Sequence, residues 1–257
     1  MPCSNQYSDA AGSCQPLLQR WVDKGRRWLE ALLWPAACLL CGRSGAGDID
    51  LCSDCVGDLP RNDPACVVCA EPLSSSAAAR ACGECLRDPP PFVGSFVPYR
   101  YAYPLDHLVR GLKFRSELAC GRVLGELFSR CLLARGAPLP EVIVPVPLAP
   151  RRYRQRGYNQ AGEVALTIRR RTGVAVKTDV VIRQRETAEQ AGLDRKARRK
   201  NVRGAFTVVA PLRARSVAIL DDVVTTGSTA RELAAVLLQA GAEQVEVWAI
   251  ARTQPTT

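Results

Sequence analysis

Four Cys-x-x-Cys pairs are the feature of this chain that most restricts its fold. The gaps between successive pairs are ten, ten and twelve residues, and the pairs are Cys38/Cys41, Cys52/Cys55, Cys66/Cys69 and Cys82/Cys85. Two thiolates on one tight turn can share a tetrahedral ion, so four pairs can supply two zinc sites of four cysteines each. We favour sites formed by successive pairs along the chain. The sequence leaves an interleaved arrangement open.

The region of the cysteine pairs needs metal in order to fold. A segment of roughly 50 residues buries too little apolar surface to be stable alone, whereas a structural zinc ion supplies roughly 10 to 16 kcal/mol of apparent binding energy. The first ten residues lack the basic start and apolar stretch of a signal peptide, so we expect metal rather than disulfides. Closed shells of thiolates indicate structural rather than catalytic zinc ions.

The positive charge of the chain is concentrated in one segment. Residues 151–203 hold 16 Lys and Arg against 5 Asp and Glu, whereas the remainder holds 19 against 20. This distribution predicts an anionic partner at one place. No apolar run reaches the roughly 18 residues of a membrane span. We therefore expect a soluble, cytoplasmic protein without such a span.

Composition and periodicity divide the chain into three parts. Residues 1–34 form an N-terminal amphipathic helix region, residues 35–90 a double zinc ribbon, and residues 91–257 a larger domain. Apolar residues in the first part recur at spacings of three, four and seven, which is typical of an amphipathic helix. This helix packs on its own protein or docks a partner, and the sequence leaves both open.

The larger domain alternates strands with helices, which predicts a parallel α/β sheet flanked by helices. We expect a strand or hairpin over 93–103 and strands over 141–147, 174–176, 180–182, 206–209, 217–220 and 244–250. We expect helices over 105–114, 117–134, 159–172 and 228–240, with Ser116 as the N-cap of the second. Ligands of such sheets bind beyond the carboxyl ends of the strands.

The stretch VAILDDVVTTGST, from Val217 to Thr229, has the character of a ligand site at such an end. A buried strand leads to Asp221 and Asp222, and a loop of small, hydroxylated residues then begins a helix. Gly227 permits a tight turn, and the free N–H groups of a helix start attract phosphate. Adjacent carboxylates suit the vicinal hydroxyls of ribose or a metal ion, and they are costly when buried without a partner. The pattern predicts a sugar-phosphate site.

All thirteen residues of this stretch resemble the phosphoribosyl-diphosphate (PRPP) binding motif of type I phosphoribosyltransferases. The resemblance implies that Thr225, Thr226, Gly227, Ser228 and Thr229 hold the 5′-phosphate of PRPP. It also implies that Asp221 and Asp222 hold the ribose hydroxyls and serve catalysis, and that Mg²⁺ accompanies the pyrophosphate. Binding alone does not establish transfer, because some proteins of this fold use the pocket as a sensor.

Further motifs extend a resemblance over residues 31–252. They are ALLWPAACLLCG (31–42), LKF (112–114), PVPLAPRRYRQRGYNQA (145–161), QAGLDRKARRKNVRGAF (190–206) and AGA (240–242). With the double ribbon and the PRPP motif, they make the chain similar to the ComF/GntX family of phosphoribosyltransferase-like proteins. That family is linked to natural competence, the uptake of DNA. The resemblance does not name the acceptor of the phosphoribosyl group.

Two basic stretches are further candidates for the site. PVPLAPRR follows a strand at the position where related transferases have their pyrophosphate loop. Backbone amides around residues 148–152, with the charges of Arg151, Arg152 and Arg156, are expected to meet the diphosphate. Asn159, a few residues later, is either part of this site or the cap of the next helix.

The second basic stretch, residues 183–204, corresponds to the mobile loop that closes over PRPP in type I transferases. Gln190, Arg198 and Asn201 match positions that the family repeats, and we expect them to serve closure or acceptor recognition. A solvated basic helix is the alternative.

Two classes of function follow. The first is a Mg²⁺-dependent phosphoribosyltransferase, whose partner is PRPP or a related compound and which acts in competence-linked DNA uptake or nucleotide handling. The alternative is a non-catalytic sensor of PRPP or nucleotide that binds single-stranded DNA or a DNA-uptake helicase. Phosphate contacts to DNA would make affinity fall steeply with salt, and a mononucleotide pocket would show a flatter dependence. An adaptor that uses the N-terminal helix is a third interpretation.

Overall fold

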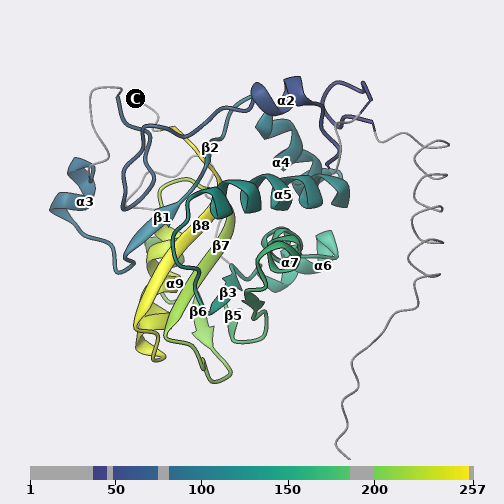
Figure 1. Cartoon of the computed structure of the whole chain (residues 1–257). Helices are drawn as coiled ribbons and strands as arrows, with labels where there is room; N and C mark the ends of the chain where they lie inside the picture. Colours follow the sequence, from purple (N-terminus) through teal and green to yellow (C-terminus); the bar gives the residue numbers. More distant parts are fainter. Residues whose placement is uncertain (1–36, 45–48, 75–80, 186–199, 255–257) are drawn as a thin grey trace, which may run out of the picture.

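The computed structural model describes residues 37–44, 49–74, 81–185 and 200–254, and Figure 1 draws the whole chain. The amphipathic helix predicted for the N-terminal part lies outside the described residues. The same holds for Gln190 and Arg198 in the second basic stretch. The division of the chain at residues 34/35 and 90/91 stays a prediction.

A parallel sheet of six strands forms the centre of the molecule, as predicted. The strand order is β1-β8-β7-β3-β4, and β2 also pairs with β8. The strands are β1 (Gly94–Phe96), β2 (Tyr99–Arg100), β3 (Val142–Pro145), β4 (Ala175–Val176), β7 (Ser216–Val224) and β8 (Gln244–Arg252). Because β1 and β2 both run parallel to β8, with Gly94 opposite Glu246 and Tyr99 opposite Ala251, residues 93–103 are one interrupted edge strand and not a hairpin.

Helices cover both faces of the sheet (Figure 1). On one face α4 (Leu105–Phe114), α5 (Leu118–Ala134) and α7 (Gln160–Thr172) share a core with Ala218 and Leu220 of β7. On the other face α9 (Ser228–Gln239) packs with Val217 and Ile219. Successive side chains of a strand point to opposite faces, so an unbroken apolar run such as VAIL belongs to a strand that is buried on both sides.

The first half of the cysteine region shares the core of the sheet. Its short helix α2 (Ser53–Gly57) follows Cys52, and Leu51 and Leu59 pack in the same cluster as α4 and α5. In the second half, α3 (Gly83–Arg87) follows Cys82. The ribbon is therefore packed against the sheet domain rather than tethered beside it.

Three local features differ from the sequence expectations. The segment expected to be a pyrophosphate loop contains a helix, α6 (Pro150–Arg156), which begins at a proline and ends before Gly157. Ser116 is not the N-cap of α5, because it has a φ of 57° and Glu117 occupies the cap position without a side-chain hydrogen bond. Strands β5 (Val181–Arg183) and β6 (Phe206–Val208) form an antiparallel pair of their own.

Candidate phosphoribosyl-binding site

The site forms where β7 outruns its neighbour β3. The last pair between these strands joins Pro145 to Leu220, whereas β7 and β8 stay paired as far as Val224 and Arg252. The sequence analysis ended this strand at Leu220, but the structure continues it through both aspartates. Beyond Leu220 one edge of β7 has no strand beside it among the described residues, and a cavity opens there.

The cavity has a volume of about 480 Å³ and lies at the carboxyl ends of β3 and β7. It brings together most of the predicted residues that the structure describes: Asp221, Asp222, Thr225, Gly227, Ser228, Thr229, Arg152 and Arg156. Thr226 lines a neighbouring cavity. Arg151 and Asn201 are not among the lining residues of either.

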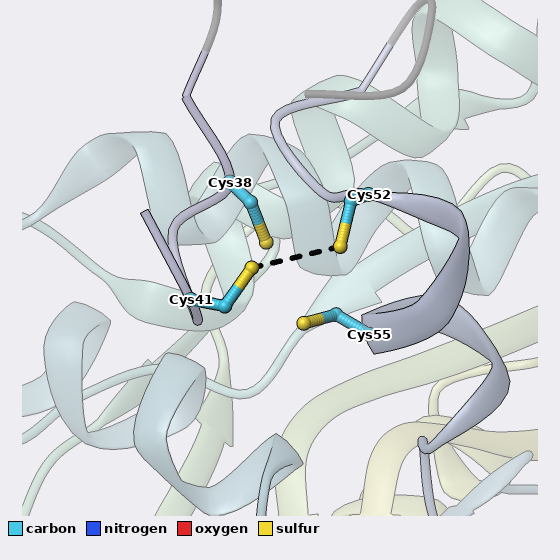
Figure 2. A group of neighbouring side chains, drawn as sticks. All are labelled: Cys38, Cys41, Cys52 and Cys55. Atoms are coloured by element: carbon cyan, nitrogen blue, oxygen red, sulfur yellow. Dashed lines mark hydrogen bonds between the residues drawn. The ribbon is translucent and has the colours of Figure 1, made fainter. Parts of the chain in front are cut away.

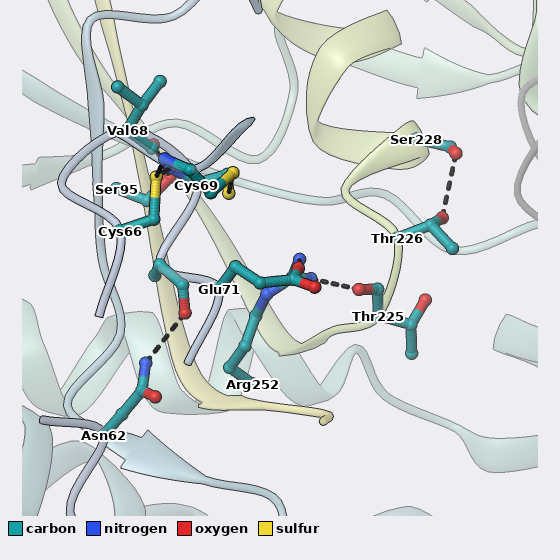
Figure 3. A network of polar contacts seen from close by, with 12 residues as sticks. Asn62, Cys66, Val68, Cys69, Glu71, Ser95, Thr225, Thr226, Ser228 and Arg252 are labelled. Atoms are coloured by element: carbon teal, nitrogen blue, oxygen red, sulfur yellow. Dashed lines mark hydrogen bonds and ion pairs between the residues drawn. The ribbon is translucent and has the colours of Figure 1, made fainter. Parts of the chain in front are cut away.

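The loop between β7 and α9 contains a glycine in the left-handed conformation directly before the helix. Gly227 has a φ of 73° and is the N-cap residue of α9, a conformation that other residues adopt at a cost. The hydroxyls of Thr226 and Ser228 lie 2.9 Å apart, and Figure 3 shows the two side chains pointing toward each other. The first residues of α9, Ser228, Thr229 and Ala230, line the cavity. The positive end of the dipole of this twelve-residue helix therefore lies at the cavity.

Lys113 is a charged residue of the site that sequence reasoning missed. It comes from the end of α4, and its Nζ lies 2.8 Å from Oδ1 of Asp222. Burial alone would lower the pKa of Lys113, but the charges of Asp222 and Asp221 outweigh it and raise the pKa. Only the LKF motif gave a signal, because the two residues are far apart in the sequence and the fold alone brings them together.

The two neighbouring carboxylates do not share the same environment. Burial, followed by the charge of Asp222, raises the pKa of Asp221 from 3.8 to about 7. Asp222 has Lys113 as an ion-pair partner. Asp221 therefore loses its proton near neutral pH. The ionised carboxylate can then accept a hydrogen bond from a hydroxyl or bind a metal ion.

Positive charge dominates the cavity. Its described lining residues include four basic side chains, Lys113, Arg152, Arg156 and Arg183, against the two carboxylates. Burial and the charge of Arg152 lower the pKa of Arg183. Like charges held together in a partly buried space favour an anionic ligand with more than one negative charge.

Asn159 is the cap of a helix, one of the two roles that the sequence analysis left open. Its Oδ1 accepts hydrogen bonds from the N–H groups of Ala161, at 3.0 Å, and Gly162. Its Nδ2 donates to the carbonyl of Val146, at 2.9 Å. The side chain therefore fixes the start of α7 to the segment that follows β3, and it lines the cavity from there.

The eight cysteines form two clusters of four, from successive pairs along the chain. In each cluster the sulfur atoms lie within 4.8 Å of one another. Figure 2 shows the first cluster, in which Cys41 Sγ and Cys52 Sγ are 3.6 Å apart. Sulfur atoms about 2.3 Å from a tetrahedral zinc ion are about 3.8 Å apart. Both clusters therefore fit one structural zinc ion each.

One thiol of each cluster has a lowered pKa, whereas burial raises the pKa of Cys55, Cys69 and Cys85. Burial acts to raise the pKa of Cys38, but backbone hydrogen bonds from Cys52 and Cys41 lower it to about 6. In the second cluster, backbone hydrogen bonds from Cys69 and Cys82 overcome burial and lower the pKa of Cys66 to about 7. One thiol of each cluster is thus readily deprotonated, and the thiolate is the form that binds metal.

Among the described helices, none is both long and apolar enough to cross a membrane.

Known proteins are similar to this chain both in the cysteine region and over most of its length. Residues 29–86 match the double zinc ribbon domain. DNA utilization protein YhgH of Escherichia coli K12 is 38% identical over 225 residues, which cover 85% of this chain and 98% of that protein. Competence protein F of Haemophilus influenzae is 35% identical over 211 residues, covering 79% and 90%. Matches of this extent are not confined to the cysteine region.

Among solved structures, a likeness is found to glutamine PRPP amidotransferase from B. subtilis complexed with ADP and GMP. It covers 50% of this chain and 25% of that chain, with a TM-score of 0.34 and 21% identity.

Proposed function

The chain belongs to the ComF-like family of competence protein F and DNA utilization protein YhgH, and from this premise we propose that its cavity binds PRPP with Mg²⁺ and transfers the phosphoribosyl group. The transfer would serve nucleotide handling during competence-linked DNA uptake in the cytoplasm, a reducing compartment that suits zinc-bound thiolates. One observation carries the proposal: a carboxylate pair and a helix N-terminus line the same basic cavity.

Each part of PRPP has a counterpart in the cavity. The 5′-phosphate would lie on the loop from Thr225 to Thr229 at the start of α9, where backbone N–H groups attract anions. Asp221 and Asp222 would accept hydrogen bonds from the ribose hydroxyls. Lys113 would hold Asp222 in place through their ion pair. The diphosphate would face the guanidinium groups of the cavity, which can form bidentate contacts with phosphate.

Mg²⁺ suits the oxygen ligands that the site offers. It takes carboxylate and phosphate oxygens, usually through one or two carboxylates together with substrate phosphates, so Asp221 and the diphosphate are the groups that would hold it. Bound there, the ion would neutralise charge on the leaving pyrophosphate. The carboxylates would at the same time face the positive charge that develops at C1′ of the ribose.

A pyrophosphate-release assay tests the transferase proposal. Wild type and Asp222→Ala are mixed with PRPP, Mg²⁺ and a panel of nitrogenous bases. We expect base-dependent release from the wild type, and release reduced at least about tenfold in the variant, which loses a charge-assisted hydrogen bond. Asp179→Ala, which removes an exposed aspartate of the same domain, is the matched control. Tight PRPP binding without release from any base would support a sensor instead.

The second candidate, a module that binds single-stranded DNA, is favoured by the surface of α6. Arg151, Tyr153 and Arg154 are exposed on this helix. Alternating basic and aromatic side chains can hold the backbone and stack the bases of a single strand. In this second candidate function, the protein would bind single-stranded DNA or a DNA-uptake helicase.

A further inference from the structure

A buried arginine links the phosphate loop to the second cysteine cluster. Arg252 is the last residue of β8, beside Val224, and is 1% exposed. Its Nη1 donates a hydrogen bond to the carbonyl oxygen of Thr225, the first residue of the loop. Its Nη2 donates to Oε2 of Glu71, with which it forms an ion pair. Figure 3 shows Arg252 between these two groups.

Glu71 belongs to the turn that carries two of the cysteines. It follows Cys69 by two residues, and its backbone carbonyl accepts a hydrogen bond from the N–H of Cys66, at 2.8 Å. The N–H of Ala70 donates to the carbonyl of Cys66, also at 2.8 Å. The position of the Glu71 carboxylate is therefore set by the turn that presents Cys66 and Cys69 to the metal.

A second contact joins the same ribbon to the start of α9. Arg231, in the first turn of this helix, donates to the carbonyl of Asp88 at 2.6 Å and to that of Pro89 at 3.3 Å. A cavity of about 440 Å³ lies between the ribbon and the start of α9, and both Cys82 and Gly227 line it. The ribbon is thus linked to the first residue of the loop through Arg252, and it contacts α9 after the last residue of the loop.

The energetics make the link through Arg252 effective. Leaving a buried charge without its partner is strongly destabilising. The ion pair with Glu71 therefore fixes the position of the Arg252 guanidinium group. Its hydrogen bond then determines where the Thr225 carbonyl lies, and with it the loop that leads to Gly227. The zinc site, Glu71, Arg252 and the loop form a continuous chain of contacts.

We propose that Arg252 is a positioning residue for the phosphate loop, and that the second zinc site sets its position through Glu71. Loss of metal from Cys66, Cys69, Cys82 and Cys85 then lowers the affinity of the loop for the phosphoribosyl ligand. This inference rests on the proposed PRPP site. It assigns to the ribbon a role in ligand binding besides its own folding.

Full-length variants with measured zinc content test the proposal. Glu71→Leu removes the acceptor for Arg252, Glu71→Gln keeps an acceptor without the charge, and Cys82→Ser disrupts the second metal site. Asp54→Asn is the matched control, because Asp54 lies two residues after a cysteine of the first cluster and is also paired with an arginine, Arg43, at 3.2 Å. Two quantities are measured: the Kd for PRPP with Mg²⁺, and hydrogen–deuterium exchange of residues 225–229 without ligand.

We expect Glu71→Leu and Cys82→Ser each to weaken PRPP binding about tenfold or more and to speed loop exchange, as loss of a hydrogen bond to a charged group does. Glu71→Gln should restore most of both. Combining Glu71→Leu with Cys82→Ser should add little, because both changes break one chain of contacts. Asp54→Asn should match the wild type.

The readouts separate this inference from the proposed function. If the wild type binds PRPP but Glu71→Leu changes neither affinity nor exchange, the positioning role is overturned. Additive effects of Glu71→Leu and Cys82→Ser would overturn the route through Glu71. If the wild type does not bind PRPP, yet both variants speed loop exchange, then the proposed function fails and the positioning of the loop stands.

Discussion

The ion pair between Lys113 and Asp222 governs how the two adjacent carboxylates hold charge. The charge of Lys113 also lowers the pKa of Asp221, and so acts against the burial that raises it to about 7. A ligand hydroxyl or Mg²⁺ needs the ionised carboxylate. Binding should therefore strengthen as the pH rises through about 7.

Removing this lysine should displace that pH dependence. In Lys113→Met, Asp221 loses a stabilising positive charge, so its pKa should rise further and the midpoint of PRPP binding should move to higher pH. Calorimetric titrations between pH 5.5 and 9 would measure the midpoint, with the exposed Lys177→Met as control. An unchanged midpoint would show that Asp221 does not control binding.

The raised pKa of Asp221 also predicts how stability without ligand depends on pH. The folded state holds this proton more tightly than the unfolded state, whose ordinary pKa is 3.8. The contribution is therefore fully present below about pH 4 and is lost as the pH rises through about 7. Asp221→Asn should flatten the dependence of Tm on pH between about 4 and 7. Parallel profiles for the variant and the wild type would show that the pKa of Asp221 is not raised in the folded state.

At the scale of elements, Gly227 decides whether the loop can enter α9. A Cβ at this position would meet no atom within 4 Å, so space is available, but the φ of 73° is unfavourable for alanine. Gly227→Ala should cost roughly 1 to 2 kcal/mol of unfolding free energy and should weaken PRPP binding.

Gly57 provides the comparison, because it is helical, has no positive φ and equally open surroundings. Gly57→Ala should be neutral or stabilising. Denaturant unfolding measures the unfolding free energy of both variants. Equal changes would show that the positive φ of Gly227 is not what makes its replacement costly.

Elements with an unbroken apolar pattern could be predicted from the sequence. The strands around Val217–Leu220 and Gln244–Ile250, and the helices packed on them, follow from periodicity alone. The extension of β7 through two aspartates could not, because its pairing with β8 is a tertiary contact that overrides the polarity of the residues. The helix α6 was missed since PRRYRQR has no apolar face. Lys113 was not identified as a site residue because only the fold brings it to Asp222.

At the scale of the whole molecule, the concentrated positive charge serves either contacts with DNA phosphates or binding of an anionic ligand in the cavity. Six to eight phosphate contacts with single-stranded DNA would give log K against log salt a slope of about −4 to −6. Arg151→Ala/Arg154→Ala on α6 should then reduce the magnitude of the slope by about 1.4. Filter binding at several salt concentrations measures it.

Arg213→Ala/Arg215→Ala removes the same charge from two residues that are also exposed. These residues come just before β7 and so lie at the amino end of this strand, whereas α6 follows the carboxyl end of β3. This control should leave the slope unchanged. A flat salt dependence of the wild type, or equal effects of the two double variants, would assign no DNA contact to α6.

The most direct test of the central claim is the affinity of the cavity for PRPP. Calorimetric titration of PRPP and Mg²⁺ into the wild type should show binding, and Asp221→Asn/Asp222→Asn should bind at least about tenfold more weakly. Asp179→Asn should match the wild type. If the double variant binds PRPP as tightly as the wild type does, the carboxylate pair does not hold the ribose and the proposed site is wrong.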